Sequence, residues 1–458
     1  MERGWKKYCW DKDFLKMVST IAIPIILQQL VENLVSLADS VMISGYSSIG
    51  VSAVQIGSQW ESIASLFSFG ICSGVGIYTA QFIGSRDMAN LKKSFGTMIT
   101  LSLLVSIPFI ALAFIIPKPI CGFFIQDAAV VQDGAAYLMI TSVSYLFVMI
   151  SFSYNYTYRC MGKTQVAMYI AGATVLINCL LNYILIYGKL GLPALGVVGA
   201  AVATLLSRAL GTLMYVVYSR STRQPFLGTF AQMFRLDREF LLPVLRRITP
   251  TVANEAFFGI GQSLYFKAFG MLGAAAITSV AIADRISNLF FMVIWAITTA
   301  VQTIIGNQLG AGEFDGAKRY ANYFMGLGAV VSVILGIGMA LTAPLFVEIL
   351  YPKEPSAVHS AAVAILAAYS IKICLRLFNS IIFGCLRCGG DTKVLALLDS
   401  VILYAVGIPL AFLSVGVFHL SIVTTIFIVQ LEQVVRIILA YRRYRSGAWI
   451  QNVTTDVQ

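Results

Sequence analysis

The chain has 458 residues, of which 58% are hydrophobic and only 12% are charged. A soluble globular protein is about a quarter charged, so this composition excludes a soluble protein and indicates a membrane protein. The net charge of +11 does not indicate a nucleic-acid-binding protein, because the Lys and Arg residues stand in short groups between apolar runs.

The first 16 residues are charged and aromatic and lack the short apolar core and cleavage site of a signal peptide. Asp11 and Asp13 precede the first apolar run and are expected to cap its first turn. Apolar runs long enough to cross a bilayer, about 20 residues each, follow along the whole chain and predict an all-α polytopic membrane protein. We expect twelve spans, at residues 17–44, 51–82, 94–116, 130–158, 164–187, 195–218, 248–270, 276–306, 319–343, 358–384, 394–414 and 418–441.

The longest loop, residues 219–247, divides the spans into six plus six. We therefore expect an N-lobe at 17–218, an inter-lobe linker at 219–247, a C-lobe at 248–441 and a tail at 442–458. If the N-terminus is cytoplasmic, 23 of the 32 Lys and Arg residues lie on the cytoplasmic side and only three on the other. The charge distribution thus predicts that both termini, residues 1–16 and 442–458, are cytoplasmic, as is the linker.

The two halves resemble each other. Pro24 and Pro250 are 226 residues apart, and "QFIGSRDMANLKK" from Gln81 pairs with "NQLGAGEFDGAKR" from Asn307 at the same offset. "RCMGKT" from Arg159 pairs with "RCGGDT" from Arg387 at an offset of 228. Because each half has an even number of spans, the repeat is parallel, about an axis along the membrane normal, as in alternating-access transporters.

Motifs of enzymes and metal sites are missing from the sequence. There is no G-x-x-x-x-G-K-[ST] loop for a nucleotide, and eight Cys with only two His, mostly inside apolar runs, suggest neither zinc nor a disulfide framework. "CLRC" at Cys385–Cys388 has the spacing of a thiol pair, but small polarizable residues at a helix end explain it better. We expect no enzymatic activity and no cofactor.

Several motifs together resemble the multidrug and toxic compound extrusion (MATE) transporters of the MOP flippase superfamily, over nearly the whole chain. They are the two loops that begin at Gln81 and Asn307 and the segments "ADSVMISG" after Pro24, "NCLLNYILIYGKLGLPALGVVGAAVAT" from Asn178, "PTVANEAF" from Pro250 and "GCLRCGGDTK" from Gly384.

The resemblance implies twelve transmembrane helices in two six-helix lobes, related by pseudo-two-fold symmetry and facing each other in a V. It implies a secondary active exporter of amphipathic organic compounds, such as drugs and dyes, in antiport with incoming Na+ or H+. The expected setting is the plasma membrane of a prokaryote, with the lipid bilayer and small organic substrates as partners, no nucleic acid, and a monomeric state.

Asp39 has no basic residue within two turns on its own helix, and a carboxylate in a span usually faces a partner, a wet cavity wall or an ion path. The resemblance places it with Asn178, Asn182 and Thr204 in a cation or proton site. Oxygens of a carboxylate, two amides and a hydroxyl suit Na+, which Asp39, Asn178 and Asn182 would bind. Some members carry Asp where this chain has Asn182, so a shared-proton pair is absent here, although a single buried carboxylate can still carry a proton.

The C-lobe carries its own charged cavity residues, Glu255, Lys267, Lys372, Arg376 and Asp399. Glu255 matches a position where family branches carry Glu; it could exchange a proton or ion, or form a salt bridge with Lys267 or a base of helix ten. Arg376 occupies the position where the NorM branch has a cation-binding Asp, so a Na+ site of that kind is not expected. Either Asp399 and Glu255 neutralise two of the bases, or the bases bind an anionic or zwitterionic substrate group.

The remaining buried charges have simpler interpretations. Glu432 and Arg436 are four residues apart on one helix and are expected to pair. Glu32 and Glu61 could line the N-lobe cavity, with Arg208 as partner for one of them. Pro24 and Pro250 are expected to act as helix hinges, because proline removes a backbone hydrogen bond.

Two functions other than cation-coupled export stay open. One is a flippase or exporter of an anionic or zwitterionic lipid-linked or metabolite substrate, which the bases of helices seven and ten would serve. The other is a membrane scaffold without transport, which would leave Asp39 and Glu255 without a reason for burial.

Overall fold

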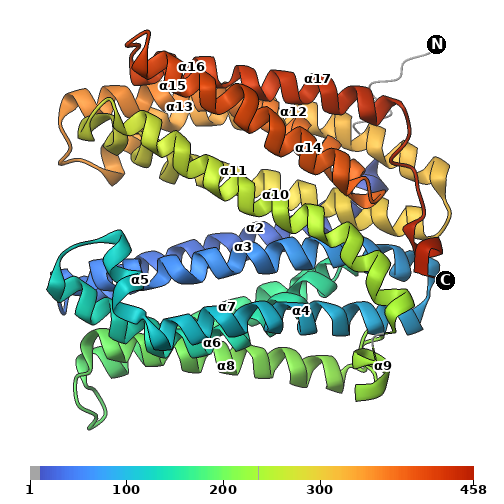
Figure 1. The fold of residues 1–458 in the computed structure, drawn as a ribbon, viewed down its shortest axis with the longest axis horizontal. Coiled ribbons are helices and arrows are strands. Elements are labelled where there is room, and N and C mark those ends of the chain that lie inside the picture. Colours follow the sequence, from blue (N-terminus) through green and yellow to red (C-terminus); the bar gives the residue numbers. More distant parts are fainter. Residues whose placement is uncertain (1–10, 236, 458) are drawn as a thin grey trace. The chain divides into compact units, whose positions relative to one another are not determined.

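The structure is a computed structural model that describes residues 11–235 and 237–457, and no strand occurs among them. The polypeptide divides into two compact units, which are described separately: the N-unit, Pro24–Val244, and the C-unit, Leu245–Gln458 together with Met1–Ile23. Each unit is a set of long helices that run side by side (Figure 1).

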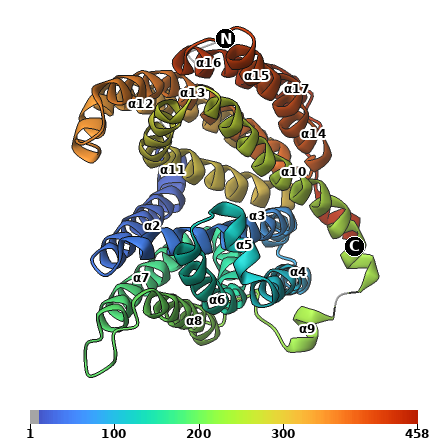
Figure 2. The ribbon, with the colours of Figure 1, turned by 60° about the vertical axis from the view of Figure 1, so that its left-hand side comes forward.

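The N-unit contains six long helices: α2 (Lys12–Ser44) from Pro24 onward, α3 (Ser48–Ser85), α4 (Met88–Ile115), α6 (Ala128–Cys160), α7 (Thr164–Tyr187) and α8 (Gly196–Ser221). The short helices α5 (Pro117–Phe124) and α9 (Phe230–Phe234) lie between and after them. Helix α6 packs against α3, α4 and α8, and α7 packs against α8, which Figure 2 shows from a second side. The site described below lies where α2, α7 and α8 contribute polar residues.

The C-unit repeats this organisation with α10 (Arg238–Gly270), α11 (Ala274–Gly310), α12 (Phe314–Leu350) and α13 (Ser356–Cys388). Its last two spans are interrupted: α14 (Thr392–Ile402) continues through a π-helical turn (Leu403–Gly407) into α15 (Ile408–Gly416), and α16 (Ile422–Val429) leads into α17 (Leu431–Arg445). Helix α13 is central, in contact with α11, α12, α16 and α17.

Eleven of the described helical segments are long and apolar enough to cross a membrane. The twelfth long helix, α10, does not meet that standard; polar residues such as Thr251, Asn254, Glu255 and Gln262 interrupt its apolar run. Together they form the predicted twelve-helix, two-lobe architecture, and the chain is a multi-pass membrane protein.

Most helices extend beyond the predicted spans, because polar residues at their ends cap additional turns. Asp11 accepts hydrogen bonds from the backbone N–H groups of Asp13 and Phe14 at 3.0 and 3.1 Å, which confirms it as a cap of α2. Asp87 caps α4 in the same way. Helix α10 begins at Arg238 rather than at residue 248, so the helix takes up the last part of the segment that was predicted as linker.

The first turns of α2 belong to the C-unit, although they precede the N-lobe in sequence. Phe14 is 1% exposed, and its ring lies 4.9–6.0 Å from those of Tyr320, Tyr323 and Phe324 on α12. The division between the units falls at Ile23 and Pro24, inside one continuous helix. This differs from the predicted N-lobe, which begins at residue 17.

Candidate functional site

A chain of polar side chains crosses the N-unit from α2 to α8. The Asn182 amide on α7 donates to Asp39 Oδ1 on α2 at 2.7 Å and to Asn178 Oδ1 at 3.2 Å. Asn178 Nδ2 donates to the Ser207 hydroxyl on α8 at 3.2 Å. The structure therefore brings three of the four predicted coupling residues into direct contact.

The fourth, Thr204, joins this chain through its backbone. Its carbonyl oxygen accepts from the Ser207 hydroxyl at 3.0 Å, while its own hydroxyl lies beside the Tyr137 phenol. Ser207 thus stands where the sequence suggested Thr204, and a signal for it was present, since the two residues are three apart on one helix face.

Asn182 Oδ1 is buried and has no hydrogen-bond partner in the described part of the chain. Leaving such an acceptor unpaired in a low-dielectric interior costs about 1–3 kcal/mol. Turning the amide over would direct Oδ1 toward Asp39 Oδ1 and Asn178 Oδ1, which creates a cluster of three oxygens. Only a cation or a proton could make that cluster stable, and oxygen ligands of this kind suit Na+.

A charged group of the N-unit lies beside this row of hydrogen-bonded side chains. The Arg208 guanidinium on α8 binds both oxygens of Glu61, at 2.7 and 2.9 Å, and donates to the Ser144 hydroxyl at 2.8 Å. The predicted partnership of Arg208 with one of the two glutamates is confirmed, and that glutamate is Glu61. Glu32 instead accepts from Gln28 Nε2 at 3.0 Å.

In the C-unit, a single arginine binds two carboxylates. Arg436 on α17 donates to Asp399 Oδ1 at 2.5 Å and binds Glu432, one helical turn before it, so the predicted Glu432–Arg436 pair is confirmed. Asp399 also accepts from Asn254 Nδ2 at 3.0 Å, and Glu432 accepts from the Tyr265 hydroxyl at 2.5 Å. Both carboxylates are therefore compensated by one buried guanidinium.

Gly407 lies against the Tyr265–Glu432 hydrogen bond, and only glycine fits at this position. A Cβ at Gly407, the last residue of the π-helical turn, would collide with the Tyr265 oxygen and with a Glu432 carboxylate oxygen. No side chain fits there without displacing the Tyr265–Glu432 hydrogen bond. π-Helical turns often mark functional sites.

The expectation that Asp399 and Glu255 neutralise two of the bases Lys267, Lys372 and Arg376 is wrong. Asp399 pairs with Arg436, and Glu255 pairs with Arg387 at 3.5 Å. Arg387 is a base of helix ten, as was expected of the Glu255 partner, because α13 extends to Cys388.

The three bases themselves lie in different surroundings. Lys267 is exposed on α10. Lys372 Nζ lies 4.4 Å from the centre of the Tyr369 ring, and the Arg376 guanidinium lies 5.7 Å from that of Phe258. Of the three, Lys372 and Arg376 line a cavity of the C-unit, together with Asp284 and Glu432, and Lys267 does not.

Both predicted hinge prolines lie inside helices, Pro24 in α2 and Pro250 in α10. Cys385 and Cys388 are buried and form no disulfide within the described residues, in agreement with their interpretation as packing residues. No group of three or more His, Cys, Asp or Glu residues able to hold a metal ion occurs among the described residues.

Comparison with known proteins identifies the family. The MatE family model matches residues 24–184 and 250–413. The uncharacterized transporter YisQ of Bacillus subtilis is 26% identical over 96% of both chains, and the probable multidrug resistance protein NorM of Thermotoga maritima is 23% identical over 95% of this chain and 93% of its own. The multidrug resistance protein MdtK of Yersinia enterocolitica is 26% identical over 86% of each chain.

Solved structures agree in fold. A MOP superfamily transporter of Pyrococcus furiosus, described as having a binding pocket of reverse polarity, superimposes with a TM-score of 0.85 at 19% identity over 98% of both chains. The Vibrio cholerae MATE transporter VcmN in its bent form gives a TM-score of 0.85 at 16% identity, over 95% of this chain and 97% of its own. With the family model covering both halves of the chain, this protein belongs to the MatE family, the multidrug and toxic compound extrusion transporters.

Proposed function

We propose that the protein is a secondary active exporter that moves amphipathic organic compounds out of the cytoplasm in exchange for incoming Na+ or H+. Asp39 is the carboxylate that takes up the coupling ion. The observation that carries this proposal is the contact of Asp39 with Asn182, whose own carbonyl oxygen is buried without a partner among the described residues. A carboxylate in a membrane span that is bound by a neutral amide is suited to receive a cation.

The ion would be held by Asp39, Asn178 and Asn182, with Ser207 completing the polar chain on α8. Uptake of the ion removes the negative charge of Asp39 and alters the hydrogen bonds that tie α2 to α7. Because the same helix contains Pro24, about four turns before Asp39, a change at the Asp39 end of α2 can be converted into a bend at the proline. The bend would couple ion uptake to release of substrate.

The family and the charge distribution support the proposed setting. The protein acts in a prokaryotic plasma membrane as a monomer, with both termini in the cytoplasm, and it needs no cofactor and performs no chemical reaction. The excess of Lys and Arg in the loops on that side supports the orientation.

The test is efflux of ethidium from proteoliposomes under Na+ and pH gradients imposed one at a time. We expect one gradient to drive efflux in the unaltered protein and Asp39→Asn to reduce it to the rate seen without a gradient. Asp133→Asn is the matched control, since it removes an exposed carboxylate of α6 in the same unit. Gradient-driven efflux that persists in Asp39→Asn would disprove the proposed role of Asp39.

A second candidate function is the export or flipping of an anionic or zwitterionic compound. The cavity residues Lys372 and Arg376, which contact aromatic rings rather than carboxylates, favour it. In the same proteoliposomes it would appear as transport of an acidic compound that outcompetes ethidium.

A further inference from the structure

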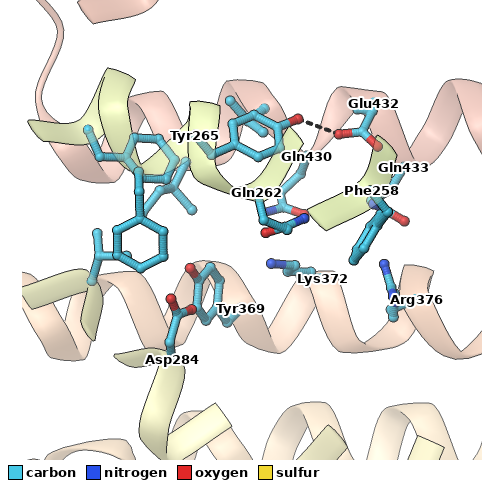
Figure 3. A pocket seen from close by; sticks show the side chains of 15 residues that line it. Phe258, Gln262, Tyr265, Asp284, Tyr369, Lys372, Arg376, Gln430, Glu432 and Gln433 are labelled. Carbon is cyan, nitrogen blue, oxygen red and sulfur yellow. Dashed lines mark hydrogen bonds between the residues drawn. The ribbon is translucent and has the colours of Figure 1, made fainter. Parts of the chain in front are cut away.

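A cavity inside the C-unit is lined by side chains of α10, α11, α13, α16 and α17 and encloses about 660 Å³ of free space, including its open mouth (Figure 3). Aromatic rings form much of its wall, among them Phe258, Tyr265 and Tyr369. Lys372 and Arg376 direct their nitrogens into the space between α10 and α13. The space inside the walls is about 90 Å³, so the cavity admits the polar end of a ligand, and an aromatic body attached to it can extend through the mouth.

Within residues 11–235 and 237–457, neither cation forms a salt bridge. No carboxylate oxygen of this described part of the chain lies within ion-pair distance of Lys372 or Arg376, and neither forms a hydrogen bond to another side chain there. Each cation lies against ring faces, Lys372 against Tyr369 and Phe291 and Arg376 against Phe258. Carboxylates attract both only from beyond salt-bridge distance, Asp284 foremost for Lys372. Three ammonium and five guanidinium N–H donors are thus available.

The acids that line the same cavity are engaged elsewhere. Glu432 is bound by Arg436 and the Tyr265 hydroxyl, and Figure 3 shows this hydroxyl contact on the far side of Gln262 from Lys372. Asp284 lies beside the Tyr369 phenol. Arg376 is attracted by Asp399, Glu432 and Glu255, but among the residues that the structure describes none of these carboxylates forms a salt bridge with it.

A ring face compensates a cation only in part, by about 0.5–2 kcal/mol, and the described carboxylates around these two cations attract them without forming a salt bridge. The two cations are one helical turn apart on α13, so they present their donors from the same face. An oxyanion between them would receive charge-assisted hydrogen bonds from both, with the guanidinium able to bind two oxygens at once. An aromatic body attached to that oxyanion would contact the surrounding rings.

We propose that this cavity binds the carboxylate group of an amphipathic aromatic acid, with Arg376 and Lys372 as its ligands. The inference rests on the proposed function in that it assigns the cavity to a substrate of the exporter. It names a class of cargo opposite in charge to the organic cations expected of the family. Zwitterions with an aromatic body and one carboxylate belong to the same class.

The test is direct binding to the full-length, detergent-solubilised protein, measured by calorimetry without any gradient. The probes are 2-naphthoate and its neutral isostere 2-naphthamide, which differ in little but charge. We expect naphthoate to bind about 10- to 100-fold more tightly, the range typical of charge-assisted hydrogen bonds. Equal binding of the two probes, or no binding of either, would overturn the proposal.

Variants then locate the binding. Arg376→Gln and Lys372→Gln should each reduce naphthoate affinity toward that of naphthamide, and Arg376→Lys should retain part of the preference because it keeps the charge. Asp284→Asn should tighten naphthoate binding, since it removes an opposing charge near Lys372. That gain of affinity cannot arise from misfolding. A naphthoate preference that survives both Gln variants would refute the assignment.

The matched control is Arg285→Gln. Arg285 is an exposed base of α11 that follows Asp284 in sequence but does not line the cavity. Its replacement should leave the affinities for both probes unchanged, and a loss equal to that of Arg376→Gln would mean that net charge rather than the cavity attracts naphthoate. Because no gradient is applied, failure of naphthoate to bind says nothing about Asp39, and failure of the Asp39→Asn test says nothing about the cavity.

Discussion

The polar clusters of the two units are built from equivalent positions but compensate their carboxylates differently. Tyr265 follows Asp39 by 226 residues, and Arg436 follows Arg208 by 228, the offsets at which the loops repeat. In the N-unit Arg208 is bound by Glu61, and Asp39 is bound by an amide. In the C-unit Arg436 holds Glu432 and Asp399, and a tyrosine stands where the N-unit has its carboxylate.

This difference indicates that the two units, although similar in fold, bind different ligands. The N-unit keeps a carboxylate that pairs with no cation among the described residues, which suits uptake of an external cation. The C-unit neutralises its carboxylates internally and leaves two cations, Lys372 and Arg376, against aromatic rings.

The largest effect is expected from removing the shared guanidinium of the C-unit. Arg436→Met leaves the carboxylates of Glu432 and Asp399 buried without compensation, and breaking such a pair costs about 3–5 kcal/mol. Thermal unfolding in detergent should show a markedly lower midpoint.

The control combines Arg436→Met with Glu432→Gln and Asp399→Asn. It removes all three charges together and should recover most of the lost stability. If the combined variant is no more stable than Arg436→Met alone, packing of the Arg436 side chain rather than charge compensation holds this cluster together.

The next effect concerns the amides that bind the two carboxylates. Asn182→Leu removes the donor to Asp39 and a potential oxygen ligand, and the coupling-ion concentration for half-maximal efflux should rise about tenfold, equivalent to about 1.4 kcal/mol. Asn254→Leu removes the corresponding donor to Asp399, which Arg436 already binds, and should leave that concentration unchanged. Equal shifts in both variants would show that the units do not differ in the way described here.

A smaller effect is expected for the ion pair of the N-unit. Glu61 and Arg208 are partly exposed, with 18% and 27% of their side chains accessible, so solvent screens their attraction. A double-mutant cycle with Glu61→Gln and Arg208→Met should give a coupling energy of about 1 kcal/mol in thermal unfolding. A coupling as large as that of the Arg436 cluster would remove the contrast between the units.

The smallest effect is expected at the Lys93–Asp237 pair, 3.0 Å apart at the start of α10. The Lys93 ammonium lowers the pKa of Asp237 below its ordinary value of 3.8. Since the folded-state pKa is the lower one, the pair stabilises the protein above the ordinary value and ceases to do so as the pH falls through the folded-state value. The difference in unfolding midpoint between the unaltered protein and Asp237→Asn should therefore be slight at neutral pH, vanish in strong acid and shrink in high salt.

Periodicity and length sufficed to predict the helices. The fifth span was expected at 164–187, and α7 runs over Thr164–Tyr187. Ends were harder to predict, because caps such as Asp87 add turns of polar residues to an apolar run. The interruption at Leu403–Gly407 was not predicted, although Gly407 and Pro409 mark it in the sequence, because the apolar run continues through it without a break.

Contacts within one helix were predictable, and contacts between helices mostly were not. The Glu432–Arg436 pair follows from four-residue spacing alone. Asp399 pairs with Arg436, 37 residues away, and Glu255 pairs with Arg387. Both pairs depend on how α10, α13, α14 and α17 pack. The resemblance to a family placed Asp39 with Asn178 and Asn182, which composition and spacing could not have done.

The π-helical turn at Leu403–Gly407 makes this span sensitive to chain length as well as to residue type. Such a turn accommodates one residue more than an α-helical turn, so loss of a single codon there would let the segment relax into a regular α-helix. Residues beyond the turn would keep their faces, because the turn already absorbs its extra residue, and the change would be confined to the turn itself. A one-codon deletion there should therefore displace Gly407 from Tyr265 and Glu432 while leaving the packing of α15 unchanged.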